Sequence, residues 1–253
     1  MKKITDFTLV GKKDFGRSAW LRLRSDEALP AIDPGQFAQV LVKDSPSTYL
    51  RRPISIHDVN MASRDVDFLV QKVGEGTRHL AEMPLGKKVN VVLPLGRGFS
   101  MEDVAGPVLL IGGGIGIAPL YLLAKRMRDR GVTPHLLLGG KTASDLVRIE
   151  DYQALGETFV TTEDGSLGEK GFVTQHSLWK ERHYERLYVC GPKPMMKAVA
   201  TIAKEQNLPC EVSLENLMAC GLGACLCCVE DTVDGHVCVC KEGPVFEIRR
   251  LKW

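Results

Sequence analysis

The chain has 253 residues, of which 44% are hydrophobic and 25% are charged, and its formal net charge is +2. This length suits one large or two ordinary domains with a sizeable core. Lys and Arg are scattered, and the longest apolar stretch is broken by glycines and Pro119, so we expect neither nucleic-acid binding nor a membrane span.

Residues 1–101 contain short apolar or alternating runs separated by turn residues such as Pro34-Gly35 and Pro94-Leu95-Gly96. The runs lie at residues 19–23, 37–42, 67–71 and 89–93. Many short strands with turns between them are typical of an antiparallel barrel, and only residues 72–83 have a helical pattern. We expect a barrel domain over residues 1–101.

Two segments of this region have residue types that suit a pyrophosphate. The sequence Arg-Arg-Pro-Ile-Ser at residues 51–55 offers guanidinium and hydroxyl groups on an extended segment. The sequence Gly-Glu-Gly-Thr at residues 74–77 follows a strand, and the helix that it opens would present free N–H groups to an anion. A solvated arginine pair and an ordinary glycine turn are the alternatives.

Residues 102–214 change to a strand-then-helix pattern, which predicts a parallel sheet with binding at its carboxyl edge. Apolar strands are expected at residues 108–111, 135–138, 158–161 and 186–189, and helices at residues 120–130 and 193–205. The first strand leads into a glycine run at residues 112–116, and the last leads into Cys190-Gly191-Pro192. Cys190 is either part of this binding edge or a buried thiol at the end of a strand with no role in binding.

The glycine run does not match G-x-G-x-x-G, because Ile117 stands where the third glycine is required. Gly139-Gly140-Lys141 also stands where an acidic residue normally closes the second strand. Glu163 and Asp164 follow the third strand and could reach ribose hydroxyls, which would favour NAD over NADP. A solvated loop is the equal alternative for these two acids.

Residues 215–253 carry six of the eight cysteines, crowded between Cys220 and Cys240. Cys220, Cys225 and Cys228 have the C-x4-C-x2-C spacing of plant-type ferredoxins, and Cys240 is the expected fourth ligand of a [2Fe-2S] cluster. The N-terminus lacks the apolar run of a signal peptide, so we expect a reducing, cytoplasmic location for these thiols.

Disulfides, a zinc site and buried core thiols without a ligand are the alternatives to a cluster. Cys227 and Cys238 exceed the four ligands that a cluster needs, and either could replace a neighbour.

The order of these motifs resembles the ferredoxin reductase-like flavoproteins, in which a six-stranded antiparallel barrel binds FAD and a parallel-sheet domain binds NAD(P). The glycine run fits the Gly-Gly-x-Gly-x-x-Pro pattern of that family. The resemblance implies three groups of cofactor-binding residues. For the flavin and its phosphates they are Arg52, Pro53, Ile54, Ser55, Leu69, Val70, Gln71, Gly76 and Thr77; for the nicotinamide nucleotide they are Gly113, Gly114, Gly116, Pro119, Cys190, Gly191 and Pro192; and for the cluster they are Cys220, Cys225, Cys228 and Cys240.

With the C-terminal cysteine module followed by Gly243-Pro244-Val245-Phe246, the chain resembles the electron transfer subunits of NAD-dependent (class 1B) bacterial dihydroorotate dehydrogenase. The resemblance implies an FAD that links two-electron transfer to NAD+ with one-electron transfer by the cluster, so no catalytic acid or base is expected. It also implies an FMN-binding catalytic partner subunit, two copies of each subunit, and a role in pyrimidine (UMP) synthesis. A ferredoxin–NAD(P) reductase-like subunit of another redox complex is the alternative.

Overall fold

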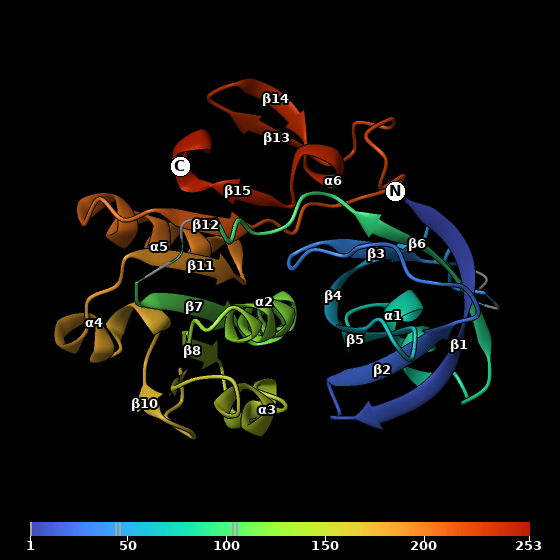
Figure 1. Ribbon diagram of the computed structural model, residues 1–253, viewed down its shortest axis with the longest axis horizontal. Helices are drawn as coiled ribbons and strands as arrows, with labels where there is room; N and C mark the ends of the chain where they lie inside the picture. The colour runs from blue at the N-terminus through green and yellow to red at the C-terminus, as the bar shows by residue number, and fades with distance from the viewer. Residues whose placement is uncertain (1, 44, 46, 103, 105) are drawn as a thin grey trace.

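The computed structural model describes residues 2–43, 45, 47–102, 104 and 106–253, and its N-terminal part is a closed antiparallel barrel (Figure 1). The strand order is β1-β2-β5-β4-β3-β6. The elements are β1 (Lys3–Asp14), β2 (Ser18–Ser25), β3 (Phe37–Val40), β4 (Arg52–Asn60), β5 (Asp65–Gln71), α1 (Glu75–Glu82) and β6 (Lys88–Leu95). The predicted six-stranded barrel is therefore present.

Alternation of side chains along the strands gives the barrel an inner and an outer face. Phe7, Phe68, Ala38 and Val40 lie in one apolar core inside the barrel. Phe37, by contrast, belongs to a second apolar core, which joins the barrel to the rest of the molecule. The outer face of β3 is therefore covered by protein rather than by solvent.

A seven-stranded sheet of order β10-β9-β8-β7-β11-β12-β15 follows the barrel. All its neighbouring strands are parallel except the pair β12–β15. The elements up to β12 are β7 (Val108–Gly113), η1 (Gly114–Ile117), α2 (Ala118–Asp129), β8 (His135–Gly140), η2 (Ala143–Asp145), α3 (Ile149–Gln153), β9 (Thr158–Thr162), β10 (Glu169–Lys170), η3 (Val173–Gln175), α4 (Leu178–Glu181), β11 (Arg186–Cys190), α5 (Lys193–Glu205) and β12 (Cys210–Ser213).

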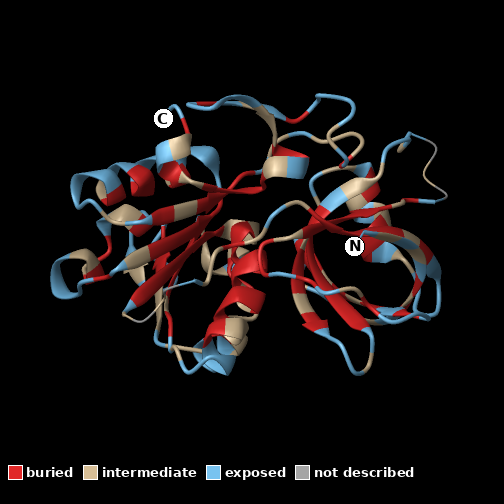
Figure 2. Ribbon diagram, turned by 45° about the horizontal axis from the view of Figure 1, so that its top comes forward, coloured by how far each residue is buried: buried red, intermediate tan, exposed pale blue. Residues whose placement is uncertain are grey.

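Helices cover both faces of this sheet. Leu109 and Ile111 of β7 pack in one core with Met196 and Val199 of α5. Leu110, in contrast, packs in another core with residues of α2. Figure 2 shows the buried residues concentrated along the strands, with exposed residues on the outer helices and loops. The carboxyl ends of the parallel strands remain free for binding, as the strand–helix pattern predicts.

The C-terminal module packs on the edge of the parallel sheet. An irregular loop carries most of the cysteines, and then follow β13 (Val229–Thr232), β14 (Gly235–Cys238), α6 (Val239–Glu242), β15 (Val245–Glu247) and η4 (Ile248–Arg250). The strands β13 and β14 form a separate hairpin, whereas β15 pairs antiparallel with β12. The module is thus joined to the sheet by backbone hydrogen bonds.

The barrel and the sheet meet chiefly through β4 and α2. The ring of His57 is completely buried, and its Nδ1 lies 2.9 Å from the carbonyl oxygen of Ala118. Lys125 forms an ion pair with Asp58 across the same boundary, with an N–O distance of 2.8 Å. Among the described helices, none is long and apolar enough to cross a membrane.

Candidate functional site

A cavity of about 590 Å³ lies at the carboxyl edge of the parallel sheet, where it faces the barrel. Its lining includes five of the residues predicted for cofactor binding: Gln71, Gly113, Gly114, Gly191 and Pro192. The barrel also contributes Arg17 and Ser18, so both domains form the walls. The cavity is thus of the size and position expected for a nucleotide site of this fold class.

The two predicted nucleotide loops are brought together because β7 and β11 are parallel neighbours. Cys190 pairs with Gly112 across these strands, so the loops that follow leave the sheet side by side. A β-carbon on Gly116 would lie only 2.4 Å from the carbonyl oxygen of Cys190. Gly116 is therefore required for this close approach, and Pro119 is buried in the first turn of α2 behind the loop.

Cys190 is buried where β11 ends, and Glu215 lies near it. Burial raises the pKa of the Cys190 thiol well above its ordinary value, and the negative charge of Glu215 acts in the same direction. Glu215 lines the cavity, where the surrounding protein raises the pKa of its carboxyl group. The thiol is therefore held in its neutral form rather than as a thiolate nucleophile.

The sequence does not single out Glu215, because it stands among the residues that lead into the cysteine loop. One signal could have found it, namely its position just beyond a strand of the parallel sheet. Of the two acids after β9, Glu163 lines the cavity. Asp164 instead accepts hydrogen bonds from the backbone N–H and the hydroxyl of Ser166.

The two predicted flavin segments are neighbours on the barrel. A β-carbon on Gly76 would lie 2.9 Å from Thr48 Cγ2 and 3.3 Å from Arg52 Cδ, so the start of α1 packs directly on the arginine segment. The Thr77 hydroxyl donates to the carbonyl oxygen of Gly74 and accepts from its N–H, which caps the helix. Arg52 donates to the carbonyl oxygen of Leu50.

The remaining flavin residues divide between the two sides of the barrel wall. Ile54 and Val70 pack in the barrel core. Leu69 packs with residues of the parallel-sheet domain instead, and Gln71 reaches the cavity. Pro53 is exposed and Ser55 half-buried on β4.

The C-terminal module gathers its cysteines beneath a loop shaped by Gly221 and Gly223, which have positive φ angles of 69° and 84°. Backbone N–H groups point at the sulfur atoms. Leu222 donates to Cys220 Sγ at 3.3 Å, Gly223 to Cys240 Sγ at 3.1 Å, and the Cys240 backbone to Cys228 Sγ at 3.3 Å. Such donors stabilise sulfur that carries negative charge.

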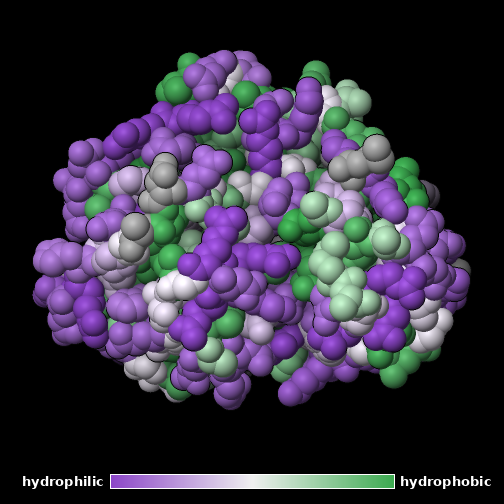
Figure 3. Space-filling view, in the orientation of Figure 1, coloured by the Kyte–Doolittle hydropathy of each residue, from purple (hydrophilic) through white to green (hydrophobic). Residues whose placement is uncertain are grey.

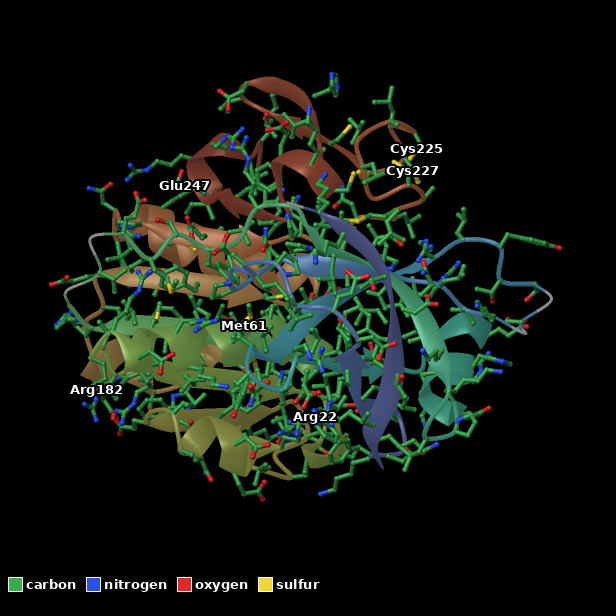
Figure 4. All side chains as sticks on the ribbon, turned by 45° about the vertical axis from the view of Figure 1, so that its right-hand side comes forward. Arg22, Met61, Arg182, Cys225, Cys227 and Glu247 are labelled. Atoms are coloured by element: carbon green, nitrogen blue, oxygen red, sulfur yellow. The ribbon has the colours of Figure 1, made fainter. Side chains whose placement is uncertain are left out.

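The ionisation of the thiols follows from these contacts. The N–H of Leu222 is the main cause that lowers the pKa of Cys220 to about 6. Burial raises the pKa of Cys240 to about 12, because this thiol and Cys228 are completely enclosed. Cys225 and Cys227 are exposed, and Figure 4 shows them at the outer edge of the loop.

The donor groups of the loop are thiols, which suit a [2Fe-2S] cluster. In the part of the chain that the structure describes, no three His, Cys, Asp or Glu side chains converge closely enough to hold one ion. Zinc would need four ligands around one centre, whereas a [2Fe-2S] core divides four thiolates between two irons. All eight cysteines are free thiols, so the disulfide alternative is not seen.

Comparison with known proteins agrees with this geometry. The family model of the iron-sulfur cluster binding domain of dihydroorotate dehydrogenase B matches residues 215–252. The oxidoreductase NAD-binding domain matches residues 110–201. The first match lies in the C-terminal module and the second in the parallel-sheet domain.

Several solved structures share the fold. The NADH-dependent reduced ferredoxin-NADP oxidoreductase, studied for flavin-based electron bifurcation, has a chain that is 29% identical with a TM-score of 0.88, and the match covers 98% of this chain and 90% of that one. The ferredoxin reductase of carbazole 1,9a-dioxygenase is 22% identical with a TM-score of 0.71, over 82% of this chain and 67% of that one. The predicted ferredoxin reductase-like fold is confirmed.

Curated relatives cover nearly the whole chain. The dihydroorotate dehydrogenase B (NAD+) electron transfer subunit of Fusobacterium nucleatum is 36% identical, with 96% of each chain covered. The subunit of the same name from Bacillus velezensis is 42% identical, with 87% of each chain covered. The chain therefore belongs to the family of electron transfer subunits of NAD+-dependent dihydroorotate dehydrogenase B.

Proposed function

We propose that this chain carries electrons from the FMN of a dihydroorotate dehydrogenase catalytic subunit, through a [2Fe-2S] cluster and FAD, to NAD+ in pyrimidine synthesis. One observation carries the proposal. The cysteine module packs on the outer face of the barrel, where Phe37 shares an apolar core with Cys228 and Cys240, while the cavity faces the same barrel. The three cofactor sites would thus adjoin one barrel. When bound, FAD supplies the exchange between two-electron and one-electron transfer.

In this proposal the cavity holds the nicotinamide nucleotide. Gly113, Gly114 and Gly116 let the pyrophosphate approach the backbone at the end of β7, and Pro119 fixes the helix behind them. Cys190, Gly191 and Pro192 form the wall for the nicotinamide, because they end the neighbouring strand. The neutral Cys190 thiol would lie behind this wall, and Glu215 lines the same cavity. Glu163 would favour NAD by accepting hydrogen bonds from the ribose.

The flavin would lie on the barrel side of the cavity. Arg52 and Ser55 would contact the phosphates and ring system, with Pro53 and Ile54 holding their spacing along β4. Gly76 and Thr77 would offer backbone N–H groups to the pyrophosphate at the start of α1. Leu69, Val70 and Gln71 would form the edge of β5 beside the ring.

The cluster would be held by Cys220, Cys225, Cys228 and Cys240. Backbone N–H groups donate to three of these four sulfurs and would stabilise the negative charge of the thiolates. Cys227 and Cys238 are the surplus thiols. The assigned domains are residues 1–101 for FAD, 102–214 for NAD and 215–253 for the cluster.

The surface around the cysteine loop suits a protein partner. Leu217, Leu222 and Leu226 are exposed there, with 84%, 50% and 63% of their surface accessible. Figure 3 shows small hydrophobic areas near the upper edge of the molecule, where Figure 1 places the C-terminal module. We infer that the FMN-binding catalytic subunit covers this surface, in a complex of two copies of each subunit in the cytoplasm.

The test compares the isolated chain with the complex. Alone, the chain should reduce an artificial dye with NADH but should not oxidise dihydroorotate. With the FMN-containing partner, dihydroorotate oxidation should be coupled to NAD+ reduction. Turnover of dihydroorotate by the isolated chain would contradict the proposal that a separate subunit oxidises dihydroorotate.

The likeness to the NADH-dependent reduced ferredoxin-NADP oxidoreductase chain favours a second candidate, an electron-transfer subunit of another redox complex. Affinity purification of the tagged chain from its own cells separates the two candidates. A partner that contains FMN and oxidises dihydroorotate supports the first, and a partner that lacks this activity supports the second.

A further inference from the structure

Gln39 is a buried polar residue with no visible reason for its burial. It lies on β3 with none of its surface accessible, and both its amide atoms, Oε1 and Nε2, lack a hydrogen-bond partner among the described residues. Burying a polar group without a hydrogen-bond partner is costly, so such groups are rare in folded proteins. The amide is therefore expected to bond to a group that binds to the protein.

The side chain of Gln39 points away from the barrel core. Ala38 and Val40, its neighbours on β3, pack inside the barrel, and strand alternation puts Gln39 on the opposite face with Phe37. That face lies beneath the cysteine loop. A β-carbon on Gly221 would stand 2.8 Å from Gln39 Cγ and 3.0 Å from Gln39 Nε2. The amide thus touches the loop at the residue that follows Cys220.

Gln39 also lies next to the barrel strand that is proposed to contact the flavin. Gln39 pairs with Pro53 on β4, which lies in the segment proposed to hold the flavin. Its carbonyl oxygen accepts a hydrogen bond from Arg51 Nη1 at 3.3 Å, which fixes the strand in place. Gln39 therefore lies between the two proposed redox sites. Leu95 packs on the same side of Gly221, 3.2 Å from its β-carbon position, which leaves an apolar setting for the amide.

We propose that Gln39 Nε2 donates a hydrogen bond to the sulfur at the Cys220 end of the [2Fe-2S] cluster and so raises the cluster's reduction potential. The inference rests on the proposed function, because it requires that the module binds a cluster. A donor at the sulfur stabilises the reduced cluster, which carries one more negative charge, over the oxidised one. The amide would then tune electron transfer between cluster and FAD without contacting NAD.

Gln39→Met tests this, because methionine keeps the length of the side chain and removes both polar atoms. Gln36→Met is the matched control, since the Gln36 amide already donates to the carbonyl oxygen of Gly96 and accepts from the N–H of Asp33. Iron and FAD contents are assayed first, and the cluster potential is then measured by an EPR-monitored titration. We expect Gln39→Met to shift the reduction equilibrium about tenfold toward the oxidised cluster, which is about 59 mV for one electron.

Gln39→Glu is a second test. An anion that can only accept hydrogen bonds should lower the reduction potential of the cluster further than methionine does. Loss of exchangeable-proton coupling in the EPR spectrum of Gln39→Met would support the direct hydrogen bond. An unchanged potential, or an equal shift in Gln36→Met, would overturn the inference. Loss of iron with full FAD in both Gln39 variants would also overturn it, because Gln39 would then hold the loop rather than tune the cluster. Wild-type protein without iron would contradict the proposed function itself.

Discussion

Cys240 lies completely buried under the cysteine loop, where its sulfur accepts the N–H of Gly223. If it is the fourth cluster ligand, Cys240→Ser should lose most of its iron and acid-labile sulfide, because a serine oxygen is a poor replacement for a thiolate at this site. Cys227→Ser is the control, since Cys227 is exposed at the edge of the loop, and it should keep two irons per chain. Full iron in Cys240→Ser with loss in Cys238→Ser would move the fourth ligand to Cys238.

His57 predicts a pH dependence of stability. Its ring is completely buried between the domains, and burial lowers its pKa from 6.5 to about 4. Since the unfolded chain binds this proton more tightly, the stabilisation is present above pH 6.5 and is lost as the pH falls toward 4, by about 3 kcal/mol in all. The unfolding free energy of the wild type should therefore fall more steeply over this range than that of His57→Asn.

The exposed His236 provides the control for that comparison. His236→Asn should keep the wild-type slope between pH 7 and 4.5. Equal slopes for all three proteins would show that His57 is protonated as readily in the folded state as in the unfolded one.

Single-residue features divide sharply into those that the sequence predicts and those that it does not. The cysteine-rich loop and its glycines can be predicted, because their spacing along the chain reflects one local loop. Gln39 and Glu215 cannot, because their significance arises from neighbours distant in sequence, namely Gly221 for the first and Cys190 for the second. Local sequence patterns do not predict contacts between residues that are far apart in the chain.

At the scale of elements, the start of α1 is fitted tightly to the arginine segment. Gly76→Ala should weaken FAD binding, because the added methyl group would push Arg52 and Thr48 away from the helix. Each 1.4 kcal/mol of lost binding energy raises the Kd about tenfold, and a rise of roughly that size is expected from overpacking. Fluorescence titration of the deflavinated protein with FAD measures it.

Gly74→Ala is the matched control two residues away, since a β-carbon there would meet nothing within 4 Å. It should bind FAD as the wild type does. Equal Kd values for the two variants would place the flavin phosphates away from this helix.

Four strands of the parallel sheet (β7, β8, β9 and β11) and its two long helices follow from the sequence, because apolar runs and helical spacing are local. The strand β1 does not, because polar residues alternate along it and few of its side chains are buried. The pairing of β15 with β12 also escapes prediction, since a three-residue strand has too little pattern to show its partner.

At the scale of the whole molecule, the barrel connects the other two regions. It contacts the nucleotide cavity on one side and the cysteine module on another, through Gln71 and Phe37 respectively. The domain order is readable from the sequence, but the contact between the first and third regions is not, because it joins residues far apart in the chain. Electron transfer within one chain requires this contact.

The most direct test is an anaerobic titration of the purified wild-type chain with NADH, followed by optical absorption and EPR. We expect that the flavin bands bleach and that an S = 1/2 signal of a reduced [2Fe-2S] cluster then appears, with about one spin per chain. Bleaching of the flavin without that signal, in protein whose cluster is reduced normally by dithionite, would contradict the relay between the two sites.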